Sequence, residues 1–301
     1  MMSLLETSIE QGLIFAVLAM GVMITYKILD IADLTVEGSF SLGAFAFARF
    51  AILGFNPYIA TFLSFIFGVL AGGITSFLYI KLKIKPLLSG ILTMTILYSI
   101  NLRLNGKANV ALFNHQTLFS NTSTIVFALL IALVVKILLD IFLKTEIGYL
   151  LIATGDNETL VKSIGKNSDS FKALGLMLSN GLVALSGSLM AQYQGFADIT
   201  MGNSIIVTAL ASVIIGDSIR KNSSLFKLTT RSILGACVYK LIGAIAIELG
   251  LNPTDLRAIS AIIVILFISY NNFASQINIK KLKNKIGGKR YVGNKKVAKE
   301  L

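Results

Sequence analysis

The stretch GLIFAVLAMGVMITYKILDIADLTVEGSFSLGAF, Gly12–Phe45, decides the fold. Its first part is apolar up to about Lys27, and it is long enough to cross a bilayer as a helix. Three carboxylates follow within eight residues, Asp30, Asp33 and Glu37, before the chain becomes apolar again. This order predicts two membrane helices joined by a polar turn. The turn lies either at the cytoplasmic surface or at a helix break inside the bilayer. In the second case it would face a cavity, because irregular backbone at membrane depth must be covered by protein or water.

The composition of the whole chain extends this interpretation. Of its 301 residues, 55% are hydrophobic and only 14% are charged, whereas ordinary soluble domains carry about 25% charged residues. Apolar runs of about 20 residues recur along the sequence, as membrane-spanning helices require. The short alternating segments of a transmembrane barrel are absent from the sequence. The chain is therefore predicted to be an all-α, polytopic transmembrane helical bundle.

We predict nine spans. Pro57, Pro86 and Pro253 fall at predicted boundaries, where proline suits the first helical turn because its missing N–H would have no partner there. The predicted spans are 9–28, 36–54, 57–81, 86–104, 122–143, 171–193, 203–219, 225–248 and 255–274.

The distribution of basic residues predicts the orientation. Nine of the 27 basic residues fall between Lys280 and Lys299. By the positive-inside rule the segment 276–301 is a basic cytoplasmic tail that touches membrane lipid, and nucleic acid is not needed to explain its charge. With nine spans, the N-terminus is then outside and the C-terminus inside. Residues 1–275 form the transmembrane domain, and the polar loop 148–170 is cytoplasmic.

The sequence lacks the common catalytic and nucleotide-binding motifs. It has no G-x-x-x-x-G-K-[ST] loop, no Cys/His cluster with metal spacing and no G-x-S-x-G elbow. The chain is therefore predicted to be neither an enzyme nor a cofactor-binding protein. Small residues instead mark helix contacts, such as Gly68 and Gly72 in a GxxxG pattern.

The cytoplasmic loop contains a short predicted helix. Asp156 or Asn157 can cap its start. Gly165 can adopt the left-handed conformation that ends it. Leu160, Val161 and Ile164 are predicted to share one apolar face. Such a face is buried either against the membrane surface or in a groove of another protein.

The same loop resembles the coupling loop of ABC importer permeases of the branched-chain amino acid/ribose type, with the approximate pattern A-x-x-x-N-x-x-x-A-x-x-x-G-x-N. Val161 stands here where alanine is usual, and Glu158 where proline is common. The first two spans and span 6 also resemble that family, and YSINLRLNGKANVALF, Tyr98–Phe113, is similar to a poorly characterised subgroup linked to amino acids, including aromatic ones. The resemblance covers about residues 8–275. It implies that the coupling residues are Ala153, Asp156, Asn157, Leu160, Val161, Ile164, Gly165 and Asn167.

The resemblance also implies the partners and the location. The chain would form a dimer with a second copy of itself in the bacterial plasma membrane. Separate ABC ATPase subunits would bind ATP and Mg²⁺, and an extracytoplasmic substrate-binding protein would deliver a small solute. The expected function is the membrane-spanning permease subunit of an ATP-driven importer, with an amino acid as the expected substrate.

Three residues are candidates for the transport pathway, namely Glu37, Asn180 and Lys240. Ionisable groups in membrane helices are costly and usually face a cavity or a partner, while Asn180 can also hydrogen-bond between helices. Asp30 and Asp33 are interpreted as cytoplasmic-end groups that pair with Lys27 or contact the ATPase. Proton coupling through these acids would instead indicate an ion-coupled secondary transporter. Such carriers often show inverted repeats, and this sequence shows no convincing internal repeat.

Overall fold

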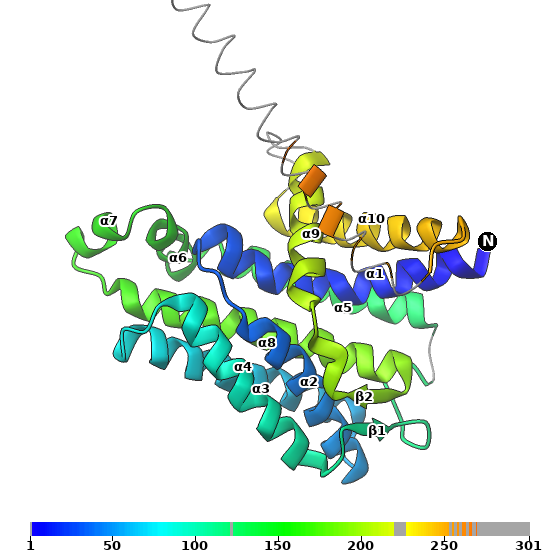
Figure 1. Ribbon diagram of the computed structural model, residues 1–301. Coiled ribbons are helices and arrows are strands. Elements are labelled where there is room, and N and C mark those ends of the chain that lie inside the picture. The colour runs from blue at the N-terminus through cyan, green and yellow to red at the C-terminus, as the bar shows by residue number, and fades with distance from the viewer. Residues whose placement is uncertain are drawn as a thin grey trace, which may run out of the picture.

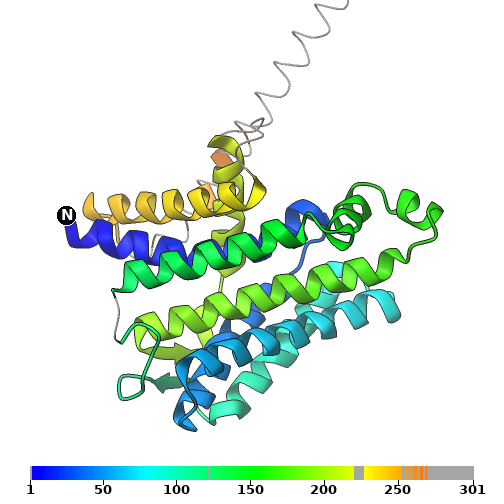
Figure 2. The ribbon, with the colours of Figure 1, turned by 180° about the vertical axis from the view of Figure 1, so that it is seen from behind.

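The computed structural model describes residues 2–120, 123–219 and 227–252, together with isolated positions up to residue 269. The helices form two groups with α8 (Ser168–Gln194) between them, as Figures 1 and 2 show from opposite sides. The first group is α1 (Met2–Met23), α5 (Thr124–Phe142) and α10 (Leu228–Glu248). The second group is α2 (Thr35–Ile52), α3 (Pro57–Ser76) and α4 (Pro86–Asn105). A further helix, α9 (Ile205–Ile219), crosses α1 and α10 at a steep angle (Figure 1).

Seven helices of the described chain are long and apolar enough to cross a membrane, which supports the predicted polytopic bundle. The predicted span 36–54 forms α2, but α2 is not among the seven. Most of the predicted span 255–274 lies outside the described residues. The count of nine therefore stays a prediction. The seven candidate spans are Leu4–Ile28, Pro57–Lys81, Pro86–Asn105, Thr124–Phe142, Ser168–Gln194, Ile199–Ser218 and Leu228–Glu248.

Helix α2 is less apolar because other helices surround it. Fourteen of its 18 residues are buried, so it does not need the apolar surface that contact with lipid requires. A Cβ atom on Gly43 would overlap the carbonyl oxygen of Ala184, and one on Gly187 would overlap that of Phe40. Since only glycine permits this distance, the backbones of α2 and α8 are in direct contact.

The predicted GxxxG pattern in α3 is also a helix contact. A Cβ atom on Gly68 would overlap the carbonyl oxygen of Asn180, and one on Gly72 would overlap that of Leu176. Both neighbours are on α8, so α3 and α8 approach as closely as small residues allow. Helix α8 is thus the central helix against which α2 and α3 pack.

Helices α1 and α3 end in the same way. Each continues into one π-helical turn, η1 (Ile24–Ile28) after α1 and η2 (Phe77–Lys81) after α3. Each turn is followed by a residue with positive φ, Asp30 at 53° and Lys83 at 54°. The backbone N–H of the next residue then bonds six residues back, Ile31 to Thr25 and Ile84 to Leu78. The two helix ends thus have the same local structure, which was not predicted from the sequence.

Two loops of this all-α bundle also form a short strand pair. Two three-residue strands, β1 (Asn109–Ala111) and β2 (Phe196–Asp198), form an antiparallel pair in which Val110 is opposite Ala197. The 3₁₀ turn η3 (Ile199–Gly202) follows β2. Figure 1 shows the strand pair and the N-terminus at one end of the bundle, with α6 (Glu146–Asp156) and α7 (Glu158–Ser163) at the other. The strands connect two loops that are far apart in sequence.

Candidate functional site

The predicted coupling segment contains the predicted short helix, α7, and a second short helix, α6, before it. Thr145 caps α6 by accepting a hydrogen bond from the backbone N–H of Gly148 at 3.2 Å. Asn157 has extended backbone and separates α6 from α7. Its side chain caps α7 by accepting a hydrogen bond from the N–H of Leu160 at 3.1 Å. Gly165 has φ +75°, the left-handed conformation predicted for it. The cap, the short helix and the stop are therefore confirmed, whereas α6, which precedes the cap, was not predicted.

Helix α6 packs on the end of the first span. Leu151 and Thr154 are buried on its inner side, and a Cβ atom on Gly155 would overlap the carbonyl oxygen of Ile28. Ala153 on α6 is half-buried, while Asp156 at its end is exposed. The start of the coupling segment is therefore held directly against the turn that follows α1.

The apolar side chains of α7 do not share one face, which corrects the prediction. Val161 is fully buried, with 0% of its surface exposed, whereas Leu160 and Ile164 are 54% and 57% exposed. Successive helical residues are rotated by about 100°, so Leu160 and Ile164 point outward on one side while Val161 points inward. The exposed apolar surface of α7 is therefore the pair Leu160 and Ile164, which we call the α7 pair.

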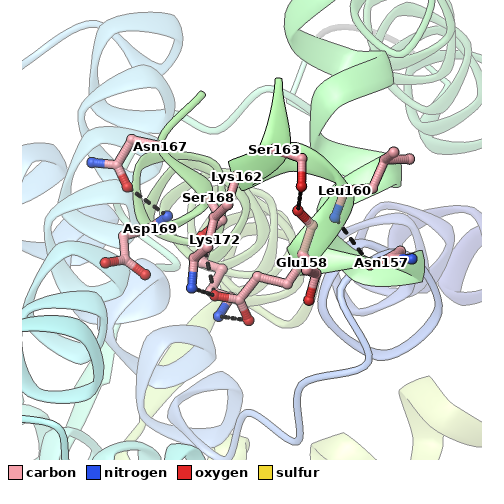
Figure 3. Close-up of polar contacts among 10 residues, drawn as sticks. Asn157, Glu158, Leu160, Lys162, Ser163, Asn167, Ser168, Asp169 and Lys172 are labelled. Carbon is pink, nitrogen blue, oxygen red and sulfur yellow. Dashed lines mark hydrogen bonds and ion pairs between the residues drawn. The ribbon is translucent and has the colours of Figure 1, made fainter. Parts of the chain in front are cut away.

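Ion pairs hold α7 against the start of α8 (Figure 3). The carboxylate of Glu158 lies 2.7 Å from the ammonium groups of both Lys162 and Lys172 and accepts a hydrogen bond from Ser168 at 3.1 Å. Hydrogen bonds from Lys162 and then Lys172 lower the pKa of Glu158 to about 2. Lys162 is one helical turn from Glu158, a spacing that suggests the first pair, but Lys172 is 14 residues away in sequence. No sequence pattern indicates this second contact.

The last predicted coupling residue, Asn167, starts the next helix. Its side chain accepts a hydrogen bond from the N–H of Asp169 at 3.0 Å and so caps α8. Beside it, Lys166 forms an ion pair with Glu146 at 3.1 Å, which connects the loop after α7 to the start of α6. Both asparagines among the predicted coupling residues, Asn157 and Asn167, therefore cap the start of a helix.

The carboxylates of the opening stretch have different environments. Asp33 is only 3% exposed. It accepts hydrogen bonds from the N–H of Thr35 at 2.9 Å and from Nδ2 of Asn180 at 2.7 Å. Lys27 pairs instead with Asp217 at 2.6 Å. The expected pairing of Asp33 with Lys27 is therefore wrong, because Lys27 pairs elsewhere and the buried carboxylate of Asp33 accepts from the first backbone N–H of α2. The alternative, a contact of Asp33 with the ATPase, stays a prediction.

The three pathway candidates are not one cluster. Asn180 is fully buried and also accepts a hydrogen bond from Ser39 at 2.7 Å, so it contacts the start of α2. Glu37 is half-buried in the first turn of α2. Lys240 donates to the amide oxygen of Gln11 at 3.2 Å, and its ammonium group lies 3.7 Å from the ring centre of Phe15. It therefore packs on α1 with a cation–π contact.

A second buried carboxylate connects α5 to α10. Lys136 and Asp140, whose spacing of four residues places them one helical turn apart, form an ion pair at 3.0 Å. Asp140 also contacts Lys227 at 2.9 Å and accepts a hydrogen bond from Thr229 at 2.6 Å. These two partners lie at the start of α10, about 90 residues later in the chain. The sequence pattern identified only the local partner.

Comparison with known proteins shows that the chain is similar to transport permeases. The family model described as the permease component of the branched-chain amino acid transport system matches residues 4–269. A tyrosine transport system permease protein of Clostridioides difficile is 46% identical over 286 residues, covering 95% of this chain and 96% of that protein. An uncharacterized protein of Rickettsia prowazekii is 35% identical over 275 residues, 89% of this chain and 98% of that protein.

More distant relatives are import permeases as well. The ribose import permease RbsC of Haemophilus influenzae is 25% identical over 216 residues, 69% of this chain and 67% of that protein. No solved structure matches the chain. Since the family model spans nearly all of the predicted membrane domain, this multi-pass inner-membrane protein belongs to the family of branched-chain amino acid transport permeases, the membrane-spanning components of ABC importers.

Proposed function

We propose that this chain is the permease subunit of an ATP-driven importer for an amino acid, with tyrosine as the first substrate to test. The observation that carries the substrate class is the 46% identity to a tyrosine transport permease, which extends over 95% of this chain. Two copies of the chain would form the membrane part. An external substrate-binding protein would supply the solute, and two ATPase subunits would bind ATP and Mg²⁺ on the cytoplasmic side.

The α7 pair is the proposed contact with the ATPase. Leu160 and Ile164 are more than half exposed at the end of the bundle opposite the N-terminus. Exposed apolar side chains on a short, well-capped helix suit insertion into a groove of a partner protein. The N-terminus would then be outside the cell, as the basic residues predict.

The contacts around α7 offer a route from the ATPase to the membrane helices. Glu158 and Lys172 join α7 to α8. Further along α8, Asn180 contacts Asp33 and Ser39 at the start of α2. A displacement of α7 would thus act on α8 and through it on α2, which lies in the centre of the bundle. Coupling of this kind requires two arrangements of these helices that ATP and substrate each favour differently.

The test is uptake by the reconstituted permease with its ATPase and substrate-binding protein. The double variant Leu160→Glu with Ile164→Glu should abolish tyrosine uptake, because two carboxylates cannot enter an apolar groove without a large desolvation cost. Thr159→Glu is the matched control, since Thr159 is an exposed residue of the same helix outside the α7 pair. Normal uptake by the double variant would overturn the proposed coupling contact.

The same assay separates the importer from an ion-coupled carrier. An importer requires ATP, the ATPase subunit and the binding protein, and it keeps its activity when ion gradients are collapsed. Uptake that needs a proton or sodium gradient and no ATPase would overturn the proposal in favour of a secondary transporter.

A further inference from the structure

Helix α6 carries exposed apolar side chains that are not part of the proposed contact between α7 and the ATPase. Ile147 is 47% exposed and Tyr149 is 62% exposed. They flank Gly148, where a Cβ atom would overlap the carbonyl oxygen of Phe142 in the last turn of α5. Both side chains are therefore fixed immediately beside the end of a membrane span, unlike the α7 pair, which lies beyond the break at Asn157.

The surface of α5 leads directly to these residues. Leu133, Ile137 and Ile141 repeat every fourth residue, and they are 45%, 53% and 58% exposed. This spacing places them on one stripe of the helix. Another side of α5 lines an apolar cavity of about 1030 Å³ together with α3 and α8. Helix α5 is long and apolar enough to cross a membrane, so contact with lipid would suit its exposed apolar stripe.

We infer that α6 is an interfacial helix that binds phospholipid, with the side chain of Tyr149 inserted among the lipid headgroups. Tyrosine is favoured at this depth because its ring is apolar and its hydroxyl reaches water. Lys144, exposed in the turn between α5 and α6, is positioned for the lipid phosphates. The inference rests on the proposed function and deepens it, since it divides the coupling segment into a lipid-bound α6 and an ATPase-bound α7.

The chain contains no tryptophan, which permits a direct test on the full-length protein. Tyr149→Trp and Leu160→Trp each give a protein with a single tryptophan, which is excited selectively at about 295 nm, beyond the absorption of tyrosine. Both are reconstituted in vesicles of phosphatidylcholine and phosphatidylglycerol, with or without phosphatidylcholine brominated near the top of its acyl chains. Bromine quenches tryptophan on contact. Emission of the Tyr149→Trp variant should be at least halved by the brominated lipid, and emission of the Leu160→Trp variant should be almost unchanged. Ile147→Trp provides a second position on α6, about 200° around the helix from Tyr149, and it should be quenched less than Tyr149→Trp.

The outcomes distinguish the two proposals. If neither α6 variant is quenched, and their emission changes only when the ATPase is added, α6 contacts the ATPase and the lipid inference is overturned while the proposed function stands. If Leu160→Trp in the importer assembled with its ATPase is quenched as strongly as Tyr149→Trp, the lipid contact of α6 stands and the docking of α7 is overturned.

Discussion

Asn180 donates a hydrogen bond from Nδ2 to the buried carboxylate of Asp33 at 2.7 Å, and this bond connects the central helix α8 to the break between α1 and α2. The same carboxylate accepts a hydrogen bond from the backbone N–H of Thr35, the first residue of α2. The amide oxygen of Asn180 accepts from Ser39 in the next turn of α2. One asparagine thus fixes how α2 begins relative to α8.

Replacing Asn180 should destabilise the protein more than replacing its partner hydroxyl. Asn180→Leu leaves the buried Asp33 without its side-chain donor, at a cost of about 1.5–3 kcal/mol. Ser39→Ala removes one neutral hydrogen bond and should cost about 1 kcal/mol. Thermal unfolding of the purified variants in detergent measures the difference. Equal melting temperatures for the two variants would show that the contact between Asp33 and Asn180 contributes nothing to the fold.

Two neighbouring glycines in α3 offer a matched test of the contact with α8. A Cβ atom on Gly72 would overlap the carbonyl oxygen of Leu176, whereas one on Gly73 would lie 3.9 Å from its nearest neighbour, a methyl group of Met177. Gly72→Ala should therefore push α3 away from α8 and destabilise the protein by about 1–3 kcal/mol. Gly73→Ala should be neutral or slightly stabilising, because alanine favours the helix. Unfolding transitions in detergent measure both, and a reversed order would contradict this packing.

The depressed pKa of Glu158 predicts how the attachment of α7 depends on pH. The pKa falls from an ordinary value of 4.5 to about 2 when Glu158 contacts Lys162 and Lys172 in the folded protein. Its contribution to stability is therefore complete above about pH 4.5, and it is lost as the pH falls from there towards 2. Amide hydrogen exchange in α7, corrected for intrinsic rates, should show constant protection between pH 5 and 8 and weaker protection in acid.

The variant Glu158→Gln should show the reduced protection already at pH 7. Glu146→Gln is the control, because the side chain of Glu146 is 77% exposed and its ion pair with Lys166 is on the surface. It should leave exchange in α7 almost unchanged. Equal exchange in both variants and the unaltered protein would mean that Glu158 does not hold α7 to α8.

Sequence patterns predicted the local features of this protein well. Asn157 as a cap, Gly165 as a helix stop and the pairing of Lys136 with Asp140 all follow from residues within one or two turns of each other. The glycines of α3 were likewise identified by their spacing. Each of these signals depends on helix geometry that is the same in every protein, so no knowledge of the tertiary fold was needed.

Such local patterns could not predict the tertiary contacts between helices. Asp33 and Asn180 are 147 residues apart in sequence, and Glu158 and Lys172 are on different helices. The burial of Val161 depends on how α7 packs against the other helices. The strand pair β1–β2 forms only because the fold brings two distant loops together. A chain with few charges also gives few clues about which of them meet inside the membrane domain.

The central claim is that the α7 pair contacts the ATPase. It is tested most directly by placing a photoreactive benzophenone amino acid at position 160 in the assembled importer and illuminating it in the membrane. Position 159, also exposed on α7, serves as the control. The account predicts a covalent product between the permease and the ATPase from position 160, with a much lower yield from position 159. Labelling of lipid alone from position 160, in an importer that hydrolyses ATP and transports, would contradict it.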